Sequence, residues 1–137
     1  MAIDVSFVTE VSDVAAFEAL LLDYYEDVLQ VAYAAGLPEQ SPAGLARASI
    51  DHLDEMLPPK GRLLLARDQD GQLVGCGTLR RIRPDAVEMK RMFVRPQARG
   101  TGVGRQLFEM RIAEARQMGC RAVYADTAKG NRAMLAM

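Results

Sequence analysis

The residues with the clearest chemical potential form a glycine-rich segment at positions 97–105, between an apolar stretch and an amphipathic pattern. Glycine inside a helix costs about 1 kcal/mol relative to alanine, so glycines at a helix start need a reason. The segment carries two arginines and no acid before Glu109. Because the N-terminus of a helix is partially positive, this pattern predicts a site for a phosphorylated ligand. The residues assigned to it are Gln97, Arg99, Gly100, Thr101, Gly102, Val103, Gly104 and Arg105.

Two well-known phosphate loops fit this segment less well. A Walker-type loop needs Gly-Lys followed by Ser or Thr, whereas Gly104 is followed by Arg105 and Gln106. A dinucleotide fingerprint needs G-x-G-x-x-G and an acid about 20 residues later. Here the glycines are spaced G-x-G-x-G, and the corresponding downstream region has no acid before Asp126. The sequence therefore disfavours both a nucleoside triphosphatase and a dinucleotide-binding domain.

The elements around the segment are predicted from hydrophobic periodicity and turn residues. Alternating apolar residues predict a strand at 3–7, and helical spacing predicts helices at about 12–35 and 42–57. Strands are expected at 62–67, 73–82, 86–94 and 122–125, with a helix over 103–119 and a last helix beginning near Asn131. The order β-α-α-β-β-β-α-β-α predicts a mixed α/β fold, with a hairpin-rich sheet covered by helices.

The segment Gln97-x-x-Gly100-x-Gly102, preceded by Met-Phe-Val-Arg-Pro and followed by Gly104, resembles the acyl-CoA-binding signature of the GNAT family of N-acetyltransferases. The strand before it, the helix after it and the next strand are similar to that family's order, over roughly residues 60–137. The resemblance implies the acyl-CoA N-acyltransferase fold, acetyl-CoA as co-substrate, and a small-molecule or peptide amine as acceptor. It also implies that four further residues approach the pantetheine arm of the cofactor: Met92, Phe93, Val94 and Asn131.

Acetyl transfer from a thioester to an amine requires that the amine lose a proton, which a carboxylate can accept directly or through water. Glu88 is our candidate for this general base because it lies in a largely apolar strand, and central strands rarely hold charge without cause. Strict alternation places Glu88 and Lys90 on one face, up to the bulge that the resemblance implies. The alternative is a structural ion pair of Glu88 with Lys90 or Arg80. Both roles fit the sequence.

The first predicted helix contains the cluster Tyr24-Tyr25-Glu26-Asp27. The resemblance implies that the first two helices form one side of the acceptor pocket, where aromatic and acidic side chains would suit a cationic amine. An amphipathic helix with one tyrosine in the core and its acids in solvent has the same pattern.

The resemblance also implies a tyrosine that protonates the leaving thiolate, and two more strands, all beyond Met137. We interpret the chain as a C-terminally incomplete domain. The alternative is that a partner chain, such as a second copy in a homodimer, covers the apolar edge of the fifth strand. A non-catalytic acyl-CoA-binding regulatory module of the same fold is the alternative function, and the tyrosine's absence from this sequence supports it.

Length and composition limit the remaining classes of protein. The 137 residues predict a single domain spanning 1–137. A net charge of -1 and few aromatic residues argue against a nucleic-acid-binding protein. No run of 18 apolar residues predicts a membrane span, and no secretion signal opens the sequence, so we expect a cytoplasmic protein. The two cysteines, Cys76 and Cys120, suggest neither a disulfide framework nor a metal site.

Overall fold

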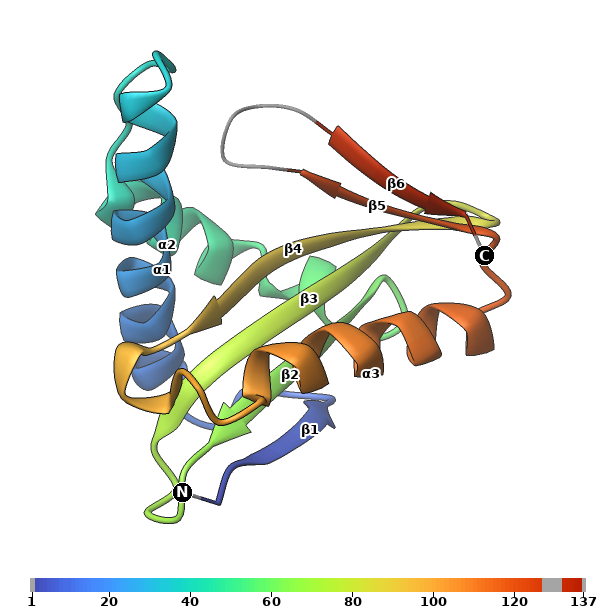
Figure 1. Ribbon diagram of the computed structural model, residues 1–137, viewed down its shortest axis with the longest axis horizontal. Coiled ribbons are helices and arrows are strands. Elements are labelled where there is room, and N and C mark those ends of the chain that lie inside the picture. Colours follow the sequence, from blue (N-terminus) through green and yellow to red (C-terminus); the bar gives the residue numbers. More distant parts are fainter. Residues whose placement is uncertain (1, 127–131, 137) are drawn as a thin grey trace.

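The centre of the structure is a twisted sheet in which six described strands lie in chain order (Figure 1). This computed structural model describes residues 2–126 and 132–136. The strands are β1 (Asp4–Val8), β2 (Gly61–Arg67), β3 (Leu73–Arg83), β4 (Ala86–Val94), β5 (Ala122–Asp126) and β6 (Arg132–Ala136). Neighbouring strands pair antiparallel except β4 and β5, which are parallel. A helix joins β4 to β5, as a parallel pair requires.

Helices cover both faces of this sheet (Figure 1). The first, α1 (Val14–Ala34), packs with α2 (Pro42–Asp51) and the 3₁₀ turn η1 (Leu53–Met56) on one face, whereas α3 (Val103–Gln117) packs on the other. The strand alternation explains why both faces are apolar: Leu63 and Leu65 pack on the α1 side, and Leu64 packs on the α3 side. Within the described residues, no helix combines the length and the apolar character that crossing a bilayer would need.

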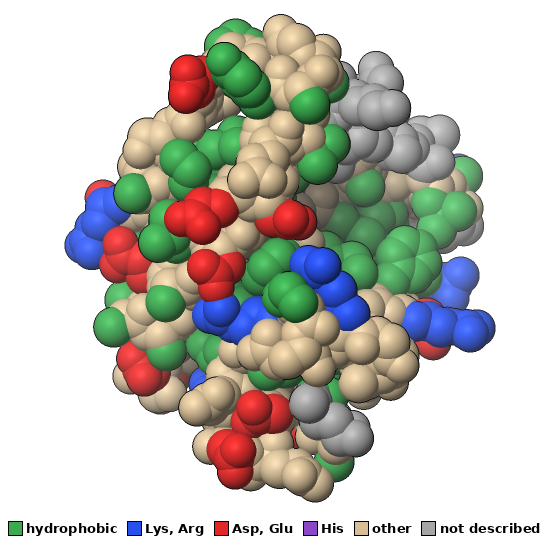
Figure 2. All heavy atoms as spheres, turned by 60° about the vertical axis from the view of Figure 1, so that its left-hand side comes forward, with side chains coloured by type: hydrophobic (Ala, Val, Ile, Leu, Met, Phe, Trp, Pro, Cys, Tyr) green, Lys and Arg blue, Asp and Glu red, His purple; other side chains and the backbone are tan. Residues whose placement is uncertain are grey.

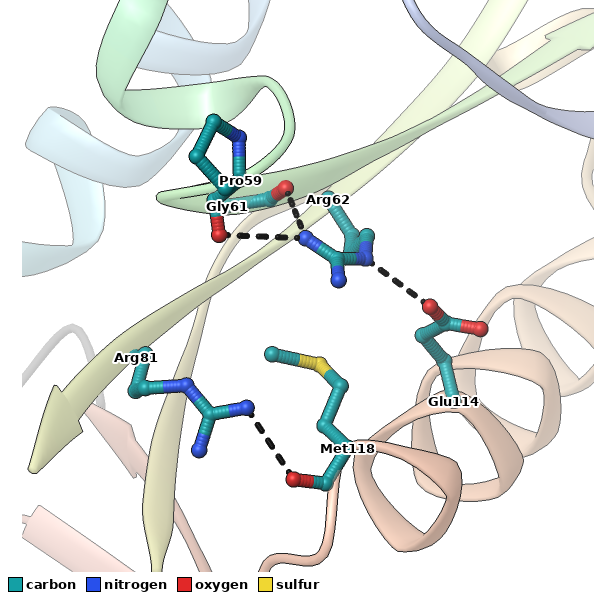
Figure 3. A network of polar contacts seen from close by, with 6 residues as sticks. All are labelled: Pro59, Gly61, Arg62, Arg81, Glu114 and Met118. Carbon is teal, nitrogen blue, oxygen red and sulfur yellow. Dashed lines mark hydrogen bonds and ion pairs between the residues drawn. The ribbon is translucent and has the colours of Figure 1, made fainter. Parts of the chain in front are cut away.

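Two arginines, the half-buried Arg62 and the exposed Arg81, fasten α3 to the sheet. Arg62 on β2 donates from Nε to Glu114 Oε2 on α3 over 2.9 Å, and its Nη1 donates to two carbonyls at the start of the strand. Arg81 on β3 donates from Nη2 to the Met118 carbonyl at the end of α3, over 3.0 Å (Figure 3). These bonds fix the axis of α3, and with it the position of the glycine-rich segment at the opposite end of the helix.

We expect Arg62→Ala to lower the free energy of unfolding by about 1–2 kcal/mol, because a partly buried Glu114 would lose a charged hydrogen-bond donor. Urea denaturation followed by circular dichroism measures this loss. Arg47→Ala is the matched control, since Arg47 pairs with Glu18 and Asp51 on the surface and should contribute less than about 0.5 kcal/mol. Equal losses in the two variants would show that the Arg62 pair does not fasten α3.

The mixed α/β class and most element positions predicted from sequence are confirmed, but the predicted last helix is wrong. Residues 132–136 form β6, which pairs antiparallel with β5 from Asp126↔Arg132 to Ala122↔Ala136. The run Arg-Ala-Met-Leu-Ala favours a helix by intrinsic propensity. Pairing satisfies the backbone groups along the apolar edge of β5, so tertiary context overrides that propensity.

Candidate functional site

The glycine-rich segment forms a tight loop that ends in an uncapped helix. Gly100 and Gly102 have φ of +80° and +84°, in the left-handed region that favours glycine. Gly102 is the residue before α3, no described side chain caps the helix, and its first turn contains no acid. A Cβ on Gly104 would lie 3.4 Å from Met92 Cε, so this glycine lets the helix start approach β4 closely. The loop therefore presents backbone N–H groups and a positive helix end to solvent.

The side chains predicted to help this loop have different positions. Gln97 lies exposed in the 3₁₀ turn η2 (Pro96–Ala98), and Thr101 donates from its hydroxyl to the Ala98 carbonyl. Arg99 donates from Nε to the Val94 carbonyl, which holds it beside the end of β4. Arg105 is exposed and pairs with Glu109 one turn later, over 2.8 Å. An anion bound at the loop would therefore compete with Glu109 for Arg105.

A bulge interrupts β4 next to the loop, as the resemblance implies. The pairing of β3 with β4 shifts between Cys76↔Phe93 and Thr78↔Lys90, and Arg91 has a positive φ of 52°. The Cys76 thiol donates to the Arg91 carbonyl over 3.1 Å, and burial raises the pKa of this thiol to about 12. Cys76 therefore acts as a protonated donor that supports the strained residue.

The parallel neighbour β5 leaves β4 just before this bulge (Figure 1). Their pairing ends at Met89↔Ala125, whereas β4 continues to Val94. A cleft of about 450 Å³ lies at this point, between α1, the bulge of β4 and the middle of α3. Figure 2 shows a recess with hydrophobic side chains beside basic ones, and acidic side chains over α1 nearby. The residues lining the cleft are Tyr24, Tyr25, Val28, Met89, Lys90, Arg91, Met92, Phe108, Arg111 and Ala125.

The carboxylate of Glu88 is buried next to the cleft and is ion-paired. Its Oε1 lies 3.3 Å from Lys90 Nζ and 3.8 Å from Arg80 Nη2. Lys90 lines the cleft, whereas Glu88 is not among the lining residues. The ion pairs that the sequence allowed are therefore present, and the general-base role of Glu88 stays a prediction.

The tyrosines of α1 also reach the cleft. Tyr25 shares a hydrogen bond of 2.9 Å with Ser49 Oγ, which ties α1 to α2, and the rings of Tyr24 and Tyr25 meet edge to face. Burial raises the pKa of Tyr24 to about 12, so its phenol is protonated at neutral pH. Glu26 and Asp27, from the same cluster, are exposed instead.

Some predicted residues are not brought together, and one cleft residue was missed. Of the residues implied to contact the pantetheine arm, Met92 lines the cleft, Phe93 packs in the core beside α1, and Asn131 lies outside the described residues. Arg111 was missed. Its position, four residues after Leu107 and four before Ala115, puts it on the buried stripe of α3 and was the available signal.

Comparisons with known proteins agree with this geometry. The model of the acetyltransferase (GNAT) family matches residues 16–137. An uncharacterized N-acetyltransferase of Schizosaccharomyces pombe is 37% identical over 71 residues, which are 51% of this chain and 44% of that protein. The IAA acetyltransferase of Azospirillum brasilense is 41% identical over 76 residues, which are 55% of this chain and 49% of that protein.

The chain thus spans about half the length of these two relatives. The crystal structure of an acetyltransferase from Streptococcus agalactiae has the same fold, with a TM-score of 0.66 and 21% identity. The superposition covers 90% of this chain and 73% of that one. Since the family model matches most of the sequence and the fold agrees, the chain belongs to the acetyltransferase (GNAT) family.

Proposed function

We propose that this protein transfers an acetyl group from acetyl-CoA directly to a primary amine. Two features close to each other carry the proposal. One is the uncapped start of α3 at Gly102, and the other is the cleft that forms where β5 leaves β4. A helix N-terminus without acids suits a pyrophosphate. An acyl-pantetheine arm bound at that loop would run along the bulged part of β4 into the cleft. Membership of the acetyltransferase family supports the same assignment.

The chemistry requires few protein groups. The amine loses a proton, its nitrogen attacks the thioester carbonyl, the new C–N bond forms as the C–S bond breaks, and the thiolate takes up a proton. We propose Glu88 as the group that accepts the first proton. Because Lys90 lines the cleft and contacts this carboxylate, whereas Glu88 is not among the described lining residues, transfer through a water molecule fits better than direct contact. Backbone N–H groups of residues 92–94 would polarise the thioester carbonyl.

Calorimetric titration with acetyl-CoA, NAD and ATP tests the assignment of the loop. We expect saturable binding of acetyl-CoA alone, since the loop lacks the lysine of a triphosphate site and the spacing of a dinucleotide site. Tight binding of NAD or ATP, with none of acetyl-CoA, would contradict the proposal.

Thiol release with a broad panel of amines separates the enzyme from a non-catalytic acyl-CoA-binding module. An enzyme should release free CoA in proportion to acetylated amine, at one thiol for each product. Binding of acetyl-CoA without amine-dependent thiol release, by the chain and by any longer native form, would favour the regulatory module.

A further inference from the structure

The floor of the cleft holds a buried arginine that no described carboxylate neutralises. Arg111 is only 2% exposed, yet it lines the cleft. Its Nε donates to the Leu107 carbonyl over 3.1 Å and its Nη1 to the Thr78 carbonyl over 3.2 Å. Arginine has five N–H donors, and none of the described residues provides an acceptor for Nη2. A buried charge without a counter-charge is costly, so a stability role does not explain Arg111.

Strand β3, which packs against α3, leaves space for the Arg111 guanidinium. A Cβ on Gly77 of β3 would lie 3.0 Å from Arg111 Nε and 3.1 Å from its Cζ. Glycine weakens the interior of a strand, because it has no side chain to pack and loses more entropy on folding. Gly77 and Arg111 are therefore each unfavourable for folding. Together they place the Arg111 guanidinium beside the cleft.

The remaining charge around the cleft is also positive. Lys90 and Arg91 line it with Arg111, and no acid is among the described residues that line it. Lys90 is paired with Glu88, but Arg91 Nε is buried with no hydrogen-bond partner among the described residues. Burial lowers the pKa of Arg111 to about 10, which still leaves the guanidinium protonated at neutral pH. The cleft therefore presents two cations, Arg91 and Arg111, that lack acidic partners in the described structure.

The phosphates of acetyl-CoA are badly placed to be the missing anion. The glycine-rich loop adjoins Val94, which pairs with Gly75 on β3. Arg111 is held instead at the Thr78 carbonyl, three residues further along β3, which at about 3.3 Å per residue is roughly 10 Å away. The acetyl group itself carries no charge. The CoA thiolate is an anion only while it leaves, so of the two reactants only the amine can bring a lasting anion to this position.

We propose that the acceptor is an amine that also carries a carboxylate, and that Arg111 binds this carboxylate with Arg91 as a second cation. The inference rests on the proposed acetyl transfer. A planar carboxylate matches the fork of the guanidinium and takes up its unused donors. Arg111 is thus a specificity residue, and the acetyl-transfer chemistry takes place at the amine end of the same acceptor.

Paired acceptors test this inference, because an amino acid and its carboxamide present the same amine with and without the negative charge. We would measure thiol release with α-amino acids, 4-aminobutyrate and the corresponding carboxamides. The wild-type kcat/KM should favour the carboxylates by about tenfold or more, the usual size of a hydrogen bond to a charged group. Arg111→Met should remove this preference by raising KM for the carboxylates, with acetyl-CoA affinity unchanged.

A merely structural Arg111 would behave differently. The Arg111→Met variant should unfold at the same temperature as wild type or higher, because among the described residues Arg111 bonds only to the Leu107 and Thr78 carbonyls, so no ion pair is lost and a buried charge is removed. Gly77→Ala should reduce the preference in the wild-type background, by displacing the guanidinium, and should have no further effect on it in the Arg111→Met background. Arg116→Met, on the exposed side of α3, is the control that should keep the preference.

Three outcomes would overturn the inference. If the wild type uses carboxamides as efficiently as carboxylates, the inference is wrong and the proposed acetyl transfer still stands. A carboxylate preference that survives in Arg111→Met would also overturn it. So would faster Arg111-dependent transfer from succinyl-CoA than from acetyl-CoA to the carboxamides, since the carboxylate would then belong to the acyl donor. No thiol release with any acceptor would instead contradict the proposed function itself.

Discussion

Gly102→Glu should lower the affinity for acetyl-CoA by about 100-fold or more while leaving the protein folded. Apart from its chain neighbours, no described atom lies within 4 Å of a Cβ built on Gly102, so the side chain fits, and the folding cost is limited to the positive φ of +84°, about 1–2 kcal/mol. The new carboxylate would lie at the start of α3 and satisfy the positive helix end itself. It would therefore occupy the place of the pyrophosphate and repel it.

Calorimetric titration of acetyl-CoA into wild type and two glycine variants checks this. Gly36→Glu is the matched control, because Gly36 also has a positive φ, of +92°, and open space around its Cβ, but follows the end of α1. It should lose similar stability and keep its affinity. If Gly102→Glu also binds acetyl-CoA like the wild type, the phosphates do not bind at this loop.

The loop and the elements beside it were predictable from the sequence because their determinants are local. The glycine pattern predicted a helix start, and α3 begins directly after Gly102, with Gly100 and Gly102 in the left-handed region. The turn Asp-Gln-Asp-Gly joins β2 to β3, with Gly71 at a positive φ of 79°. The face of the sheet to which each β4 side chain points could be predicted only up to Lys90, since the bulge at Arg91 depends on pairing with β3.

Features that depend on distant residues were not predictable in the same way. Residues 132–136 have the composition of a helix, and only the unpaired edge of β5 explains why they form β6. On α3, the large apolar Phe108 is 44% exposed beside the cleft, whereas the charged Arg111 is buried. The usual rule places charged side chains in solvent and aromatic rings in the core. It fails here because both side chains line the cleft at the middle of α3.

Glu88→Gln should lower turnover by about 10²–10⁴, the usual contribution of general acid–base catalysis, and leave acetyl-CoA affinity unchanged. The geometry supports this expectation in one respect. The Glu88 carboxylate is buried on β4 beside Lys90, which lines the cleft, so a single water could connect it to an amine bound there. The amide has the same shape but cannot accept the proton. The loss should shrink as pH rises, because more of the amine is then deprotonated in solution.

Steady-state rates of wild type and Glu88→Gln between about pH 6 and 10 measure this effect, since the free-amine fraction rises across that range for ordinary primary amines. Glu55→Gln is the control, since Glu55 also pairs with Arg80 but its side chain is only half-buried. A structural ion pair predicts another result: a drop in unfolding free energy of about 1 kcal/mol, because Lys90 and Arg80 are partly solvated, with turnover unchanged at every pH. Unchanged turnover at neutral pH would reduce Glu88 to that structural role. The proton acceptor would then have to be sought on α1, around Tyr24 and Glu26.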